Sequence, residues 1–487
     1  MGRTGDLMIA LTRAGPAGSR RVLGWATGRS IAPNSITAIS LLFALCASAW
    51  LSGGTQADYL RGLAALCAWA AGRVCSRGLN AIVPPRTREA APGRTDWLVL
   101  PGFDWPGAGR PRSPGTVPLT KPRAGERDFG WLYEVTTVAA ECAVYGGITA
   151  GGEAAGWTGT WPLAVVTIVV VSVAEIAGTC ARARSEPAGQ ARRPPGMWST
   201  LGLMLPPPVA VRVLTATLVM IRYGPRIALF TVLVIESVTL ARALVKLVES
   251  RPASDEGPAA GPALTAASQG QHVLLACRDD GPLARLAGRI VQGNIGPLPP
   301  AFLGLVAIVV LGVLGLRQMP GIIALTPAVV LLLAAPGSSH PHDGRFDWLV
   351  PVLLCLAQYS YLVALGFARS VPGPAIFSAV SMIAVWYASL AASPRARAQV
   401  NSKVLSSRPE RISKIIRRRA DGPGWEARVW LVGLAGMFGV AVFGYVGLAA
   451  YLAALMGRKA AIGYLLSPDE QPAQGSTRST RRKDRRQ

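Results

Sequence analysis

The chain has 487 residues, of which 51% are hydrophobic and 16% charged, and its mean hydropathy is positive at +0.35. A composition this apolar is atypical of a soluble protein of this length and predicts a membrane protein. The formal net charge is +24, but no aromatic-basic stripe accompanies the charge, and most of it falls between apolar runs. We therefore expect membrane lipids as partners and no nucleic acid.

Apolar runs recur along the chain at lengths that match a bilayer. A hydrocarbon core of about 30 Å takes about 20 helical residues to cross, and about eleven stretches meet that requirement. They cover residues 35–51, 57–73, 130–150, 161–179, 204–221, 227–246, 301–316, 321–335, 348–368, 373–392 and 429–456. The sequence thus predicts an all-α fold, a polytopic transmembrane helical bundle of about eleven spans.

Lysine and arginine alternate in step with these runs. Residues 1–29 and 77–127 are rich in arginine, whereas residues 52–56 between them hold no basic residue. Because cytoplasmic loops retain Lys and Arg, we predict a multi-pass protein of the cell membrane with a cytoplasmic N-terminus. After eleven spans the basic tail, 467–487, would lie outside, so either residues 429–466 fold as a hairpin or the tail departs from the charge bias.

Composition also divides the chain into two membrane domains. Residues 249–300 shift to Pro, Ala, Gly, Ser and charge, which predicts a cytoplasmic linker between domains at 1–248 and 301–466. Within the first domain, residues 78–128 are rich in Pro, Gly and Arg and predict an irregular cytoplasmic insertion. The tail at 467–487 is predicted to be disordered.

The layout of the first half resembles a known enzyme family. An arginine-rich segment leads into Ala32-Pro33-Asn34-Ser35-Ile36-Thr37, which suits a helix entry, and the predicted spans follow from a cytoplasmic start. This layout resembles the CDP-alcohol phosphatidyltransferase family, and residues 205–245 with the second half resemble actinobacterial members that carry an extra C-terminal membrane domain. The resemblance implies phosphoalcohol transfer from a CDP-linked donor, Mg²⁺ or Mn²⁺ as cofactor, and a homodimer or heterodimer.

The family signature begins DxxDGxxAR and continues GxxxDxxxD, so that carboxylates on two facing helices hold divalent cations against a pyrophosphate. Aligning the first glycine with Gly72 places Ala68 and Ala71 where the first two aspartates belong. A shift by one residue recovers Arg77 at the arginine. By resemblance, Gly72 and Arg77 are substrate-binding positions.

The second part of the signature is also incomplete. Gly130, a third substrate-binding position by resemblance, is followed by Glu134 at the offset of an aspartate, and Val138 stands at the last carboxylate. Glu134 is therefore the catalytic candidate, at a relic position. A single carboxylate does not hold two divalent cations, so we expect no metal-dependent transfer unless other ligands replace the missing ones.

Several ionisable residues fall within predicted spans, where charge is costly and commonly faces a partner or a cavity. They are Glu134, Glu141, Glu175, Arg212, Glu236 and Arg242. Two interpretations stay open: Glu–Arg pairs that hold the bundle together, and a relic substrate site.

Two polar clusters mark the second half, both on the predicted cytoplasmic side. Residues 277–285 contain DGxxAR in full, with Asp280 and Arg285; either this is a displaced motif or Asp280 caps a short amphipathic helix at 282–291. The other cluster is His340, His342, Asp343 and Asp347. It is either a divalent-metal ligand set or a capped turn that enters a helix.

Three functions follow as alternatives. The first is a phosphatidyltransferase-like membrane protein without metal-dependent transfer, which binds lipid or a CDP-linked nucleotide or pairs with an active relative. The second is a non-enzymatic transport or membrane-assembly component that uses the C-terminal half. The third is active phosphoalcohol transfer with rearranged ligands such as Glu134 and Asp128.

Overall fold

The computed structural model describes residues 33–82, 124–185, 208–249, 278–290, 296, 298–317, 326, 329, 333, 346–392 and 424–465. These residues form helices joined by turns, and no strand occurs among them. The all-helical class is therefore confirmed for this part of the chain.

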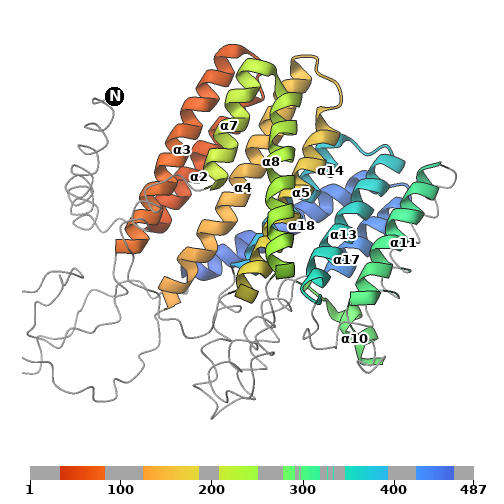
Figure 1. Ribbon diagram of the computed structural model, residues 1–487. Helices are drawn as coiled ribbons and strands as arrows, with labels where there is room; N and C mark the ends of the chain where they lie inside the picture. The colour runs from red at the N-terminus through yellow and green to blue at the C-terminus, as the bar shows by residue number, and fades with distance from the viewer. Residues whose placement is uncertain are drawn as a thin grey trace, which may run out of the picture.

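The helices follow one another through both halves of the chain (Figure 1). In the first half they are α2 (Pro33–Leu51), α3 (Gln56–Ile82), α4 (Ala124–Ala154), α5 (Thr160–Ser185), α7 (Pro208–Tyr223) and α8 (Pro225–Glu249). In the second half they are α10 (Pro282–Ile290), α11 (Leu298–Arg317), α13 (Leu349–Ala368), α14 (Gly373–Ala391), α17 (Trp425–Met437) and α18 (Ala441–Leu465). Several begin with proline, whose fixed φ and missing N–H suit the first turn of a helix.

Short turns join neighbouring helices and fix their entry angles. Between α2 and α3, Gly54 has φ 76°, and the Asp58 amide donates to Oγ1 of Thr55 at 3.2 Å, which caps α3. Between α7 and α8, Gly224 has φ 91° and Pro225 follows at once. The left-handed backbone at each glycine reverses the chain within a few residues.

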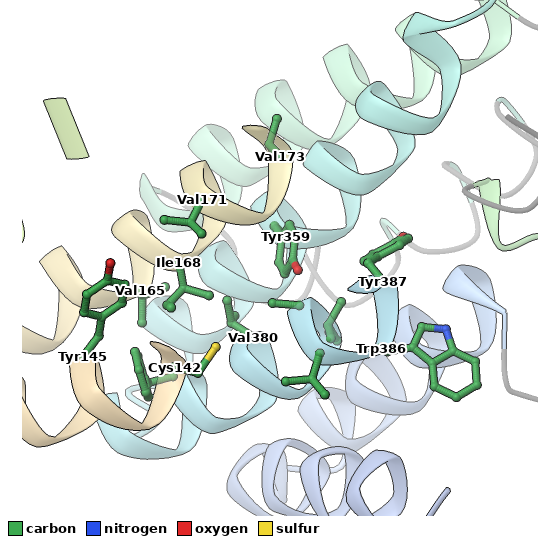
Figure 2. Close-up of a cluster of buried hydrophobic side chains, with 14 of the residues drawn as sticks. Cys142, Tyr145, Val165, Ile168, Val171, Val173, Tyr359, Val380, Trp386 and Tyr387 are labelled. Atoms are coloured by element: carbon green, nitrogen blue, oxygen red, sulfur yellow. The ribbon is translucent and has the colours of Figure 1, made fainter. Parts of the chain in front are cut away.

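Helices of the two halves pack directly on one another. α2 lies against α3 and α4, α5 lies against α8, and α14 contacts α4, α5 and α18. Figure 2 shows buried side chains from both halves in one cluster, including Tyr145, Ile168, Tyr359 and Val380. A hydrogen bond of 2.8 Å between the hydroxyls of Ser172 and Tyr359 also crosses this contact. The first and second halves therefore share a hydrophobic core.

Glycine allows the closest of these approaches. A Cβ atom on Gly147 or Gly151 of α4 would overlap the backbone of α2 at Ser48 or Leu51. Small residues permit this kind of backbone approach between membrane helices. The contact of α2 with α4 therefore depends on two glycines one turn apart.

Among the residues that the structure describes, five helices are long and apolar enough to cross a membrane. They cover Thr160–Ala181, Pro225–Val245, Leu349–Ala368, Gly373–Ala391 and Ala441–Ala461. Two shorter apolar helices, Ser35–Leu51 and Leu298–Gly312, accompany them. The total of about eleven spans stays a prediction, and the predicted span at 321–335 lies almost entirely outside the described residues.

The end of the described chain is a helical hairpin. α17 ends at Met437, α18 begins at Ala441, and the two helices pack together. Gly439 has φ 73°, and the Val440 amide donates to the Ala435 carbonyl at 2.9 Å, which closes the turn. The hairpin alternative for residues 429–466 is confirmed, and a single span over 429–456 is wrong because the chain reverses at this glycine.

Candidate functional site

Arg73 joins α3 to α4 near the position of the expected transferase signature. Its Nη1 donates to Oγ1 of Thr136 at 2.9 Å and its Nη2 to the carbonyl of Tyr133 at 2.5 Å. The guanidinium carbon lies 3.6 Å from the centre of the Tyr133 ring, a cation–π contact. Arg73 is fully buried. A fixed positive charge thus lies between the two helices.

The neighbouring face of α3 is closed by α2. A Cβ atom on Gly72 would lie 2.9 Å from Cβ of Ser40, so Gly72 permits close packing of the two helices. One turn further on, the hydroxyls of Thr37 and Ser76 are hydrogen bonded at 2.7 Å. Gly72 therefore lies in a helix–helix contact.

Two of the residues selected from the sequence, Arg77 and Glu134, lie close to Arg73. Arg77 is half-buried, with its guanidinium carbon 6.0 Å from the centre of the Tyr133 ring. Glu134, the next residue, has an exposed side chain, and Gly130 lies one turn earlier in α4. Within the described part of the chain, no group of three or more His, Cys, Asp or Glu side chains is arranged to hold a metal ion. The described residues here do not fit the pair of divalent cations that the resemblance implies.

The predicted metal ligands of the second half are only partly described. His340, His342 and Asp343 lie outside the described residues. Asp347 is buried in the turn that precedes α13. The metal site therefore stays a prediction.

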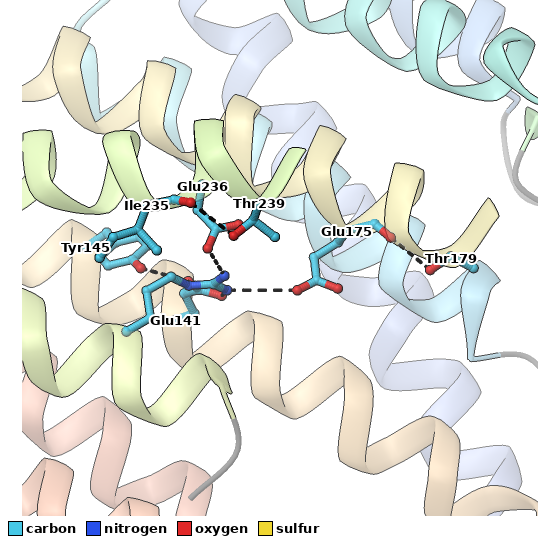
Figure 3. A network of polar contacts seen from close by, with 8 residues as sticks. Glu141, Tyr145, Glu175, Thr179, Ile235, Glu236 and Thr239 are labelled. Atoms are coloured by element: carbon cyan, nitrogen blue, oxygen red, sulfur yellow. Dashed lines mark hydrogen bonds and ion pairs between the residues drawn. The ribbon is translucent and has the colours of Figure 1, made fainter. Parts of the chain in front are cut away.

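A second polar cluster links four helices inside the bundle (Figure 3). Arg212 of α7 makes a two-point contact with Glu141 of α4, Nε to Oε1 at 2.6 Å and Nη2 to Oε2 at 2.7 Å. Its Nη1 also donates to Glu236 of α8, and Glu175 of α5 lies 4.0 Å away. The hydroxyl of Tyr145 donates to Glu141 at 2.7 Å. The predicted Glu–Arg pairing is confirmed for these residues.

Arg212 is outnumbered by the carboxylates around it. Glu141 and Glu236 are buried with it, whereas the side chain of Glu175 is 48% exposed. Planar two-point contacts of this kind are the strongest form of ion pair, and they satisfy the guanidinium where water is excluded. The cluster therefore ties α4, α7 and α8 together and leaves Glu175 at its open side.

In the second half, α10 is held by a carboxylate from far along the chain. The amides of Gly281 and Ala284 donate to Glu426 of α17 at 3.0 and 3.4 Å. Gly281 also lies so close to Gly424 that a Cβ on either would overlap the other segment. The predicted helix at 282–291 is confirmed as α10. Its predicted cap is wrong, because Glu426 and not Asp280 accepts from the first amides.

Both aspartates before α10 are bound to the helices around them. Asp279 has φ 54°, a conformation that non-glycine residues seldom adopt, and its Oδ2 accepts from Arg428 at 2.5 Å and from Trp386 at 2.9 Å. Asp280 pairs with Arg278 and accepts from Nε1 of Trp425 at 3.0 Å. These bonds hold the turn against α14 and α17.

Burial raises the pKa of the Asp279 and Asp280 carboxyls above their ordinary value, because it disfavours the charged form. The partners of each carboxyl act in the opposite direction: Arg428 and Trp386 beside Asp279, and Arg278 and Trp425 beside Asp280. The side chain of Arg285 is exposed, and its Nε donates a hydrogen bond to the backbone carbonyl of Asp280 at 2.9 Å. The DGxxAR segment is therefore a buried charged turn.

Donor groups without acceptors lie beside this turn. Arg428 is fully buried, and its Nε and Nη1 make no hydrogen bond with the described residues. Gln358 of α13 accepts from the Tyr387 hydroxyl at 3.0 Å and from Arg428 at 3.4 Å, but its own amide nitrogen is also unpaired there. Buried donors normally have partners, so these nitrogens are donors for which the described residues supply no acceptor.

Sequence reasoning did not select Arg73, Glu426 or Arg428. Arg73 is an arginine at the end of an apolar run, and Arg428 and Glu426 precede another such run. A charged residue at the end of an apolar run could have indicated these sites, because a membrane segment accommodates a charged side chain only when that side chain has partners. Their partners come from helices distant in sequence.

Comparison with known proteins gives a match for part of the second half. A family of unknown function (DUF5941) matches residues 268–392, which include the charged turn, α10, α11, α13 and α14. No curated protein matches the chain. No solved structure matches it either. The charged turn before α10 is thus part of a segment similar to a family whose function is not known.

Proposed function

We propose that this chain is a phosphatidyltransferase-like integral membrane protein of the cell membrane that binds lipid or a CDP-linked nucleotide without metal-dependent transfer. The supporting observation is Arg73. The resemblance calls for carboxylates that hold cations at Ala68 and Ala71. Beside these positions α3 carries a buried guanidinium, that of Arg73, bound to Thr136 and Tyr133. A fixed positive charge repels divalent cations and favours an anionic group such as a phosphate.

The proposal includes a membrane topology of about eleven spans or more with a cytoplasmic N-terminus. The hairpin of α17 and α18 returns the chain to the side on which α17 begins. The basic tail then lies on the same side as the basic residues within 393–423, in agreement with the charge bias. A homodimer, or a heterodimer with an active relative, belongs to the same proposal by analogy with the family.

A second candidate function is a non-enzymatic transport or membrane-assembly component that works through the second half. The unpaired donor nitrogens of Arg428 and Gln358, beside the charged turn, favour it. This candidate predicts that Arg428→Met abolishes function in cells while the protein still inserts into the membrane.

The deciding experiment measures CMP release by the purified full-length protein in lipid vesicles, with CDP-diacylglycerol as donor, a set of acceptor alcohols, and Mg²⁺ or Mn²⁺. We expect no CMP above the protein-free background. We also expect CDP-diacylglycerol or phosphatidylglycerol to raise the midpoint of thermal unfolding, because a ligand that binds the folded state stabilises it.

Active transfer with rearranged ligands predicts the opposite. Steady CMP release that needs the metal and disappears in Glu134→Ala would overturn the proposal. The matched control is Glu153→Ala, an exposed residue at the other end of α4. Absence of both CMP release and thermal stabilisation would favour the transport or assembly function.

A further inference from the structure

An apolar groove lies between α4 and α14. Its volume is about 350 Å³. The residues that line it are Ser48, Ala139, Cys142, Ala143, Gly146, Trp161, Pro374, Phe377, Ser378, Ser381, Met382 and Val385. Small side chains on α4 leave this space, and the rings of Trp161 and Phe377, in edge-to-face contact at 5.6 Å, lie at the end where α5 and α14 begin.

The hydroxyl groups on the groove wall are mostly bound to backbone. Ser48 donates to the Ala143 carbonyl at 2.6 Å, and Ser378 donates to the Pro374 carbonyl at 2.7 Å. Ser381 is buried, and its hydroxyl lies beside the thiol of Cys142. An ordered water needs two to four polar partners, and these hydroxyls are mostly already bonded to the backbone. The walls of the groove therefore suit a hydrocarbon chain better than water.

The length of the groove matches one leaflet of a bilayer. Its lining on α14 runs from Pro374 to Val385, which is about 17 Å along a helix axis. Half of a hydrocarbon core is about 15 Å thick. α14 is itself long and apolar enough to span a membrane. A chain that enters beside Pro374 therefore reaches the end of the groove near the bilayer midplane.

We propose that this groove holds one fatty acyl chain of a membrane lipid, which enters from the leaflet on the side of residues 369–374. This inference rests on the proposal that the chain is an integral membrane protein. The groove lies between the two halves of the chain, so the bound lipid contacts both α4 and α14. The lipid thus fills the part of the shared interface that side chains leave open.

The test uses photo-crosslinking in vesicles. Full-length protein is reconstituted in phosphatidylglycerol with a trace of a phospholipid that carries a diazirine on its acyl chain. After irradiation, mass spectrometry maps the adducts. We expect adducts concentrated on Phe377 and Met382. Ala143→Phe, which fills the groove, should lower them about tenfold, whereas Ala450→Phe, the same change on the exposed face of α18, should leave them unchanged.

A second variant guards against misfolding of Ala143→Phe. Ser378→Phe places the ring at the exposed rim of the groove and should also lower the adducts. Adducts that are equally dense on the exposed Phe443 and unaffected by either groove variant would overturn the inference. CMP release is measured separately, so transferase activity would overturn the proposed function without touching this result.

Discussion

Arg73 places a buried positive charge in the contact between α3 and α4. The carbonyl of Tyr133 and the hydroxyl of Thr136 accept from its two terminal nitrogens, and the Tyr133 ring covers it. A guanidinium meets both acceptors at once because its donors are fixed in one plane. The charge of this residue is therefore locked in place between α3 and α4.

Replacement of Arg73 by lysine should be destabilising although the charge is kept. An ammonium does not reach both acceptors and stack on the ring together, so we expect Arg73→Lys to lower the free energy of unfolding by about 1–3 kcal/mol. The measurement is denaturant unfolding in detergent. Arg77→Lys, at the half-buried neighbour one turn on, should change it by less than about 0.5 kcal/mol. Equal effects of the two variants would contradict the described role of Arg73.

The charged turn before α10 should respond to pH. In the folded protein, burial raises the pKa of Asp280 above its ordinary value, so folding favours the protonated form. The stabilising contribution of this proton is complete below the unfolded pKa of about 3.9 and is lost as the pH rises through the folded pKa.

The pH-dependent contribution of Asp280 to stability can be measured by comparison with Asp280→Asn, because asparagine does not titrate. We expect the thermal midpoint of the wild-type protein, relative to that of Asp280→Asn, to be highest near pH 4 and to fall as the pH is raised. Thermal unfolding in detergent over a series of pH values gives the difference. A difference that grows with pH would mean that Arg278 and Trp425 outweigh burial and lower the pKa instead.

Among the elements, the hairpin of α17 and α18 has the clearest consequence for topology. Gly439 reverses the chain, so the end of α18 returns toward the side where Trp425 begins α17. The same region places Glu426 at the start of α10, which lies at the lower edge of the bundle in Figure 1. The hairpin therefore sets the position of α10 and brings the end of α18 back to the side on which α17 begins.

A tag at the C-terminus should be reached from the same side of the membrane as a tag inserted within residues 393–423. Both should be on the side opposite a tag inserted at Ser52, in the short turn between α2 and α3. Protease accessibility in right-side-out and inverted vesicles makes the measurement. Exposure of the C-terminal tag together with the Ser52 tag would show that the hairpin does not return the chain.

The two halves of the chain are joined by side-chain packing as well as by the chain between them. Ser172 of α5 bonds Tyr359 of α13, and Nε1 of Trp131 donates to Ser389 of α14 at 3.1 Å. The core cluster runs through helices of both halves. Because stability carried by shared contacts is lost together, the described helices should unfold as one unit.

Two buried cysteines report on this cooperativity, Cys180 in α5 and Cys355 in α13. We expect both thiols to become reactive toward an alkylating reagent at the same denaturant concentration. Ile168→Val, in the shared core, should shift both midpoints equally and cost about 0.5–1.5 kcal/mol. Mass spectrometry of the alkylated peptides gives the midpoints. If Cys355 reacted at clearly lower denaturant than Cys180, the halves would be independent units.

The helical class, the positions of many helices and the ionisable residues inside apolar segments could all be predicted from the amino-acid sequence. These are local properties, because the length of an apolar run and the prolines and glycines at its ends act within one segment. The short helix after Gly281 was predicted on the same basis and is present as α10.

The partners of these residues could not be predicted, because they depend on how the helices pack. Glu426 caps α10 from more than a hundred residues away, Arg212 gathers carboxylates from three other helices, and Arg73 binds across to α4. A buried charge is costly without a partner, but which partner it has depends on which helices pack side by side. That packing depends on contacts between distant segments, which no single stretch of sequence specifies.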